Sequence, residues 1–529
     1  MKPHLLPLRL AAAAVLAVAL HGQIPKPTVP VPDPPPQRVP SKPMASPDSA
    51  THITKDQAAS LFRSVDDILA FVSKDSHLTA TRPVKRKLLT REEVTRELSR
   101  KMNEDKGTER LERSELVLKK FGLLDRDFQL RPFLLSLLTE QVAAFYDPKT
   151  RTVNLIDWVG VDEQKPVLAH ELTHALQDDQ VHLETWGSPA PAKISKNASE
   201  DNQHILLDEA STAREALTEG QGMVTFIDYE LKDSGKTLAT APEFGDRLRD
   251  MATDTTGSPI LARAPLLLQE SLLFPYSAGL AFEQAVLTRA GVDAAFSKAL
   301  QRPPSSSHEI LHPDDYLQHA PVSLLTMPDI HGLLDRDWEP YDVGVMGELD
   351  ARIITELFGG QEISAPVTEE WDGGIYYAAQ RRSATAAQKA AKGSIGVLYL
   401  SQWKNHDSAR SFMNIYAGAL PRKYDSIKPV TFQDGDADHL LFTTEDSDVW
   451  LSLDDNSVFI AEGYDRATAR KLDTMFRDAQ GHGKLQTAGL AAPVKVTQPT
   501  GELTLGLSRL LPGFGMPQAA ARMALQATH

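Results

Sequence analysis

The chain has 529 residues, enough for roughly two to four domains, and its hydrophobic and charged fractions of 41% and 24% are ordinary for globular protein. Its formal net charge of −15 argues against nucleic acid or an anionic membrane surface as the main partner. There is no cysteine, which excludes disulfides and thiolate ligands, so any zinc site must use histidine or carboxylate side chains.

The N-terminal region is predicted to precede the folded chain. Residues 1–22 combine a basic start with an alanine-rich apolar run, which is typical of a secretory signal peptide. Residues 23–51 are dense in proline and are expected to form an extended linker. We therefore expect a secreted or periplasmic product with no stable membrane span after signal removal; the alternative is an uncleaved N-terminal anchor.

Residues 52–335 are predicted to form a mainly helical domain with a small β-element. The apolar spacing predicts helices over residues 55–73, 90–102, 111–121 and 132–141, and a short strand over 84–89. Residues 142–156 are predicted to form a β-hairpin, with its turn at residues 147–150. An edge strand of this hairpin could align an extended peptide by main-chain hydrogen bonds, or it could only cover the core.

The next predicted helix contains an HExxH sequence, His170-Glu171-Leu172-Thr173-His174. Histidines four residues apart lie on one face of a helix and can share a metal ion, and Glu171 can then reach a water bound to that ion. The flanking apolar residues predict a buried helix, in which histidines need partners. The alternative is a pair of core histidines hydrogen-bonded to carbonyl groups.

Three flanking residues complete the prediction for this helix. Asp162 is expected to cap its start, and Pro166 is expected to lie in its first turn. Asp178, one turn after His174, is expected either to accept a hydrogen bond from a ligand imidazole or to be a solvated residue near the end of the helix.

A third metal ligand is expected on the following helix, which is predicted over residues 206–231. Glu215 and Glu219 lie one turn apart on it. Glu219 is the better candidate, because it lies in an apolar stripe where a carboxylate is costly unless it is paired or bound to metal. Glu215 has a more polar neighbourhood and is the competing candidate. Gly220 and Gly222 are expected to let a partner helix approach closely.

A second HExxH sequence, His308-Glu309-Ile310-Leu311-His312, follows two predicted apolar helices in residues 264–291 that are separated near Pro275. It runs directly into Pro313, which disfavours helical geometry at His312. We therefore expect any helix to end there, and we predict the metal site at the first copy and not at the second.

Residues 336–480 are predicted to form a small α+β domain, for which a ferredoxin-like arrangement is the candidate fold. Helices are expected over residues 346–358, 407–416 and 468–476, and strands over 374–380, 394–401, 439–444, 449–453 and 457–463. Residues 481–529 are a loosely patterned tail. The overall fold class expected is therefore α+β, with a helical catalytic domain followed by the smaller one.

The HExxH helix, together with Ala216-Leu-Thr-Glu-Gly220 on the later helix, resembles the gluzincin metallopeptidases, the broad thermolysin-like class. The resemblance covers residues 141–229, and the hairpin and HExxH helix also resemble exported bacterial proteins of this class. It implies a zincin-like domain, zinc bound by His170, His174 and Glu219, and Glu171 as general base for peptide hydrolysis. One departure is Gly222, which stands where alanine is common.

The expected function is thus an exported zinc-dependent metallopeptidase that acts on a peptide or protein substrate. Such a reaction also needs a donor for the developing oxyanion. The candidates are Tyr229, Tyr276, His308, His312 and Tyr316. Two alternatives stay open: a non-catalytic zinc-containing envelope or binding protein, and a zinc hydrolase acting on something other than peptides. The sequence does not set the oligomeric state.

Overall fold

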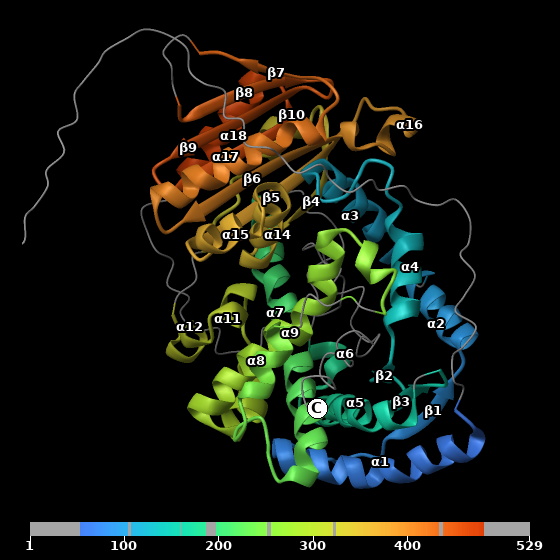
Figure 1. Ribbon diagram of the computed structural model, residues 1–529. Helices are drawn as coiled ribbons and strands as arrows, with labels where there is room; N and C mark the ends of the chain where they lie inside the picture. The colour runs from blue at the N-terminus through green and yellow to red at the C-terminus, as the bar shows by residue number, and fades with distance from the viewer. Residues whose placement is uncertain are drawn as a thin grey trace, which may run out of the picture. The chain divides into compact units, whose positions relative to one another are not determined.

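The computed structural model describes residues 53–103, 107–158, 160–186, 197–250, 255, 257–320, 324–432 and 437–480 (Figure 1). The predicted signal peptide, linker and C-terminal tail lie outside these residues, and they stay predictions. The helices up to residue 301 are α1 Lys55–Ser76, α2 Arg91–Asn103, α3 Gly107–Phe121, α4 Leu130–Gln141, α5 Val161–Val181, α6 Leu183–Trp186, α7 Ala198–Leu231, α8 Glu243–Asp250, α9 Leu266–Ala290 and α10 Ala299–Gln301.

The later helices are α11 Ser307–Leu311, α12 Pro313–Gln318, α13 His331–Leu334, α14 Glu348–Gly359, α15 Gln361–Thr368, α16 Ala386–Lys389, α17 His406–Lys423 and α18 Arg466–Ala479. The strands are β1 Lys85–Leu89, β2 Ala144–Asp147, β3 Thr152–Ile156, β4 Trp338–Val345, β5 Trp371–Arg381, β6 Ile395–Trp403, β7 Ile427–Val430, β8 His439–Thr444, β9 Asp448–Asp454 and β10 Ser457–Tyr464. The fold is therefore mixed α+β, as predicted. None of the described helices is both long enough and apolar enough to span a bilayer.

The first elements follow the predicted pattern closely. A capping box starts α1, where the Thr54 hydroxyl accepts from the Gln57 backbone N–H and the Gln57 side chain accepts from the Thr54 N–H. The predicted hairpin is also present, with β2 antiparallel to β3, and β1 pairs in parallel with the other side of β3. Strand β2 is therefore an edge strand of this three-stranded sheet, and it packs against α5.

Two helices are longer than predicted. Helix α7 begins at Ala198, before the predicted start at residue 206, because the Asn197 side chain caps it by accepting a hydrogen bond from the Glu200 N–H. Helix α9 is one continuous helix through Pro275, so the prediction of two helices is wrong. An internal proline costs about 3 kcal/mol. Apolar residues buried along both halves of α9 offset that cost.

The second sheet has seven antiparallel strands in the order β4-β5-β6-β10-β9-β8-β7. Strands β4 and β7 were not predicted, because each contains a proline that weakens the strand pattern. Both are edge strands, and proline is tolerated at a sheet edge because the missing N–H faces away from the ladder.

Both faces of this sheet are buried, because successive side chains along a strand point to opposite faces. Tyr376 and Ala378 of β5 belong to the core that includes α14 and α17, whereas Ile375 and Tyr377 belong to the core that includes α18. The seven strands and the helices on both faces make this sheet larger than the ferredoxin-like arrangement that the sequence suggested.

The packing of α3 crosses the predicted boundary between residues 335 and 336. The ring of Phe121 meets the rings of Tyr376 and Tyr399 edge to face, with centroids 5.9 and 6.2 Å apart. One continuous core includes residues from α1 to α9 and from β5 to β10. The helical and sheet regions therefore share packing, and their division into separate domains stays a prediction.

Candidate metal centre

Helix α5 presents the first HExxH sequence as one buried turn. His170 and Glu171 are fully buried and His174 is 8% exposed. The helix begins at Val161 with Gly160 at the N-cap, so the predicted cap at Asp162 is wrong, and Pro166 lies beyond the first turn. Both differences arise because the helix starts two residues earlier than a cap at Asp162 implies, and neither moves the histidines.

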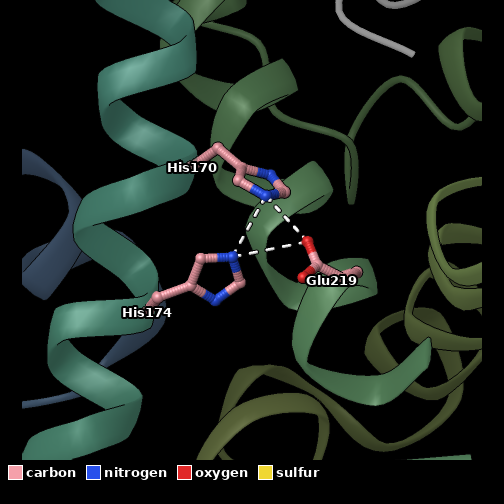
Figure 2. A group of neighbouring side chains, drawn as sticks. All are labelled: His170, His174 and Glu219. Carbon is pink, nitrogen blue, oxygen red and sulfur yellow. Dashed lines mark hydrogen bonds and ion pairs between the residues drawn. The ribbon is translucent and has the colours of Figure 1, made fainter. Parts of the chain in front are cut away.

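Helix α7 brings Glu219 to both imidazoles (Figure 2). The Glu219 Oε2 atom lies 2.9 Å from His170 Nε2 and 3.4 Å from His174 Nε2, and the two Nε2 atoms are 3.2 Å apart. Zinc bonds of about 2.0–2.2 Å place tetrahedral ligand atoms roughly 3.3–3.5 Å apart. The three separations are close to that edge length, so these residues fit a zinc-sized ion. Among the described residues, Glu219 and not Glu215 completes the triad.

The charges of the triad compensate one another. Burial alone would lower the pKa of His174, but the adjacent Glu219 carboxylate raises it to about 9. Burial would likewise raise the pKa of Glu219, but His174 and His170 hold it well below its ordinary value. Glu219 is therefore ionised at neutral pH, and a buried carboxylate of this kind needs a cation, either an imidazolium or a metal ion.

Two polar contacts fix the register of α5 against α7. The hydroxyls of Thr173 and Thr225 are 2.6 Å apart. Gln177 donates from its amide to Thr218 O at 3.0 Å and to Gln221 Oε1 at 2.9 Å, and its own Oε1 lies 2.8 Å from His174 Nδ1. The Gln177 oxygen thus orients the imidazole so that Nε2 faces the ion position.

The sequence reasoning missed this outer layer. Thr173 and Gln177 are buried polar residues at helical spacing from His170, and this spacing is the signal that could have found them. Neither predicted role of Asp178 is correct. It is 4% exposed and accepts hydrogen bonds from Arg151 at 2.7 Å and Tyr146 at 3.0 Å, so it ties the end of α5 to the hairpin.

Glycines give the site its close packing. A Cβ atom on Gly220 would lie 2.3 Å from the Gly279 carbonyl oxygen, so Gly220 lets α7 approach α9 as predicted. A Cβ on Gly222 would lie 2.6 Å from the His170 ring, so this glycine makes room for the ligand itself. The Nδ1 atom of His170, on the ring edge facing Gly222, has no hydrogen-bond partner among the described residues.

Tyr276 is the oxyanion-donor candidate that the structure places at this triad. Its ring stacks on His170, with centroids 6.0 Å apart. Burial and the nearby carboxylates, Glu219 first, raise the pKa of Tyr276 well above its ordinary value, so its hydroxyl stays protonated. The other tyrosines lie elsewhere: Tyr229 packs on Phe71, and Tyr316 donates to Arg302 O at 2.8 Å.

The histidines of the second HExxH sequence form a group that the sequence did not predict. Helix α11 does end at Leu311, and His312 is its C-cap, as Pro313 predicted. The two histidines nevertheless converge on Glu348 at the start of α14, and His308, His312 and Glu348 lie close enough together to hold a metal ion. The second copy therefore also has metal-site geometry, which we did not expect, because a carboxylate 36 residues downstream of His312 could not be anticipated from the pentapeptide. The prediction that the metal is bound at the first copy stays a prediction.

No protein-family model, curated protein or solved structure matches this chain. The resemblance to gluzincins therefore depends on the residues of the site, and membership of that class stays a prediction.

Proposed function

We propose that this chain is an exported zinc-dependent metallopeptidase, with zinc held by His170, His174 and Glu219. The observation that carries the proposal is the convergence of two imidazole nitrogens and one carboxylate oxygen at separations that suit tetrahedral zinc. The donor set of two histidines and a carboxylate is one that catalytic zinc uses, with a fourth position left for water or substrate.

The residues around the triad support a hydrolytic role. A bound zinc ion would supply a water of lowered pKa and would polarise a carbonyl group. Glu171, buried on the same turn as His170, would accept the proton of the attacking water and pass it to the leaving amine. Tyr276, protonated and stacked on His170, would donate a hydrogen bond to the developing oxyanion.

The hairpin supports a peptide as the substrate. Strand β2 pairs with β3 on one side only among the described strands and packs beside α5. An extended peptide added to such an edge would run past the HExxH helix and would be aligned by main-chain hydrogen bonds. The predicted signal peptide over residues 1–22 supports export.

The two HExxH sequences provide a matched test of the general base. In Glu171→Gln we expect kcat/KM for a peptide library to fall by about 10²–10⁴-fold while bound zinc is retained. The same exchange in the second copy, Glu309→Gln, should leave kcat/KM and zinc content unchanged. Wild-type protein that holds zinc but cleaves no peptide of a diverse library would instead support the non-catalytic binding protein.

A further inference from the structure

The second His/His/Glu group has ligand geometry of its own. Glu348 Oε2 lies 2.5 Å from His308 Nδ1 and 3.0 Å from His312 Nε2, and Glu348 Oε1 lies 2.9 Å from His312 Nε2. The ligand atoms of all three residues lie within 4.8 Å of one another. We propose that His308, His312 and Glu348 form a second metal site, which binds a zinc-class divalent cation and serves structure, not catalysis. This proposal is independent of the peptidase activity.

The surroundings of His308 are those of a metal ligand. Its Nδ1 faces Glu348, while its other nitrogen, Nε2, lies 3.1 Å from Asp315 Oδ2. Ligand histidines commonly donate their second ring N–H to a carboxylate, which fixes the tautomer and the ring orientation. The ring also packs beside Trp371, with centroids 6.0 Å apart, which shields that side of the group.

The burial of the group fits an ion that enters from one side. The side chains of His308 and Glu348 are 9% and 6% exposed, whereas that of His312 is 30% exposed. An ion would therefore reach the site past His312 and keep water as a further ligand there. A nitrogen and carboxylate donor set of this size suits zinc and its neighbours among the divalent transition metals better than calcium or magnesium.

We assign the second site a structural role because the glutamate of its HExxH sequence is engaged in other contacts. Glu309 occupies the position that Glu171 holds in the first copy. Its Oε2 accepts hydrogen bonds from the Ser305 N–H at 2.6 Å and the Ser305 hydroxyl at 2.8 Å. One oxygen of this carboxylate is therefore held by Ser305 at the start of α11.

An ion at this site would join segments that are distant in the sequence. Helix α11 packs on α7 and α9, which carry Glu219 and Tyr276, while α14 packs on α17 beneath the seven-stranded sheet. Glu348 is the first residue of α14, and the Leu349 N–H donates to the Ser307 hydroxyl at 3.3 Å. Metal binding would therefore stabilise the contact between the helical region and the sheet region, by mass action on the folded state.

The test is the zinc content of the full-length protein in variants of each triad. We expect about two zinc ions per wild-type chain, about one in His170→Ala/His174→Ala, about one in His312→Gln, and none in the triple variant. His312→Gln is chosen because glutamine can still hydrogen-bond to Glu348 but is a poor zinc ligand. Glu348→Gln provides a second removal of the same site, and circular dichroism confirms folding of each variant.

A thermal measurement separates this site from the first. In the His170→Ala/His174→Ala background, added zinc should still raise the midpoint of unfolding, and it should no longer do so once His312→Gln is introduced. The proposal is overturned if His312→Gln and Glu348→Gln both retain the zinc content of wild type, because the group is then a hydrogen-bonded cluster only. Loss of peptide hydrolysis in the first-triad variant alone would concern the proposed peptidase and not this site.

Discussion

The two His/His/Glu triads start from the same five-residue pattern and reach their geometry by different routes. In the first, both histidines belong to α5 and keep helical spacing, and the third residue comes from the neighbouring helix α7. In the second, α11 ends before His312, and the third residue begins α14. The HExxH pattern therefore indicates two neighbouring histidine nitrogens in both cases, but it does not determine the backbone conformation that carries the histidines.

The glutamate inside the pattern shows what the difference means for chemistry. Glu171 lies mid-helix and is fully buried beside the first triad. Glu309 lies in the first turn of a five-residue helix, where its carboxylate accepts hydrogen bonds from the backbone N–H and the hydroxyl of Ser305. Helix length thus separates a candidate general base from a residue that helps to start a helix.

Gly222→Ala is expected to have the largest effect among the variants that distinguish the two triads. The added Cβ would lie 2.6 Å from the His170 ring, so the ring must move. We expect zinc affinity at the first triad and kcat/KM to fall by on the order of 10²-fold, with the second triad unaffected. Isothermal titration with zinc and peptide hydrolysis assays measure the two effects.

Gly418→Ala is the control for that substitution. Gly418 lies in α17, and a Cβ there meets nothing within 4 Å. This exchange should stabilise the protein by about 0.5–1 kcal/mol and leave both triads unchanged. Equal zinc affinity in Gly222→Ala and wild type would show that His170 is not a ligand in the orientation described.

A smaller effect is expected from the residues that orient the ligands. Gln177→Ala removes the oxygen 2.8 Å from His174 Nδ1, and Asp315→Ala removes the oxygen 3.1 Å from His308 Nε2. Each should weaken zinc at its own triad by about 10- to 100-fold. Gln177 is fully buried whereas the Asp315 side chain is 38% exposed, so we expect the larger loss for Gln177.

Competition titrations with a chromogenic chelator measure both affinities in one experiment. If Asp315→Ala weakens zinc at the first triad, or Gln177→Ala at the second, the two sites are coupled and the comparison between them no longer describes separate centres.

The smallest effect concerns the scaffold outside both triads. Asp75 of α1 and Asp228 of α7 are hydrogen-bonded to each other. Burial raises the pKa of Asp75 to about 6. Burial, and after it the neighbouring charge of Asp75, raises the pKa of Asp228 to about 8. Both pKa values exceed the ordinary 3.8, so the protonated carboxyl groups stabilise the folded state. This contribution to stability is complete below pH 3.8 and is lost as the pH rises through the raised pKa values.

We therefore expect Asp228→Asn to flatten the pH dependence of the unfolding free energy between about pH 4 and pH 8, by at most about 1.4 kcal/mol per pH unit for each proton. Urea denaturation across this range measures it. Asp233→Asn is the matched control, since that side chain is 90% exposed, and should keep the wild-type slope. A slope that is the same in Asp228→Asn and wild type would contradict the assignment.

Local signals in the sequence determined much of this protein. The spacing of His170 and His174, the apolar stripe around Glu219 and the turn of the hairpin all act within a few residues, so they could be predicted. The choice of Glu219 over Glu215 also came from its neighbours on one helix, because an apolar setting demands a partner for a carboxylate.

Only the tertiary structure decided the rest. The role of Gln177, the fit of Gly222 under His170 and the meeting of His308 and His312 with Glu348 each depend on contacts between elements far apart in the chain. The same holds for α9 continuing through Pro275 and for β4 and β7 at the sheet edges. In each case packing between elements outweighs a local preference worth only a few kcal/mol, and the spacing of residues along one segment carries no information about that packing.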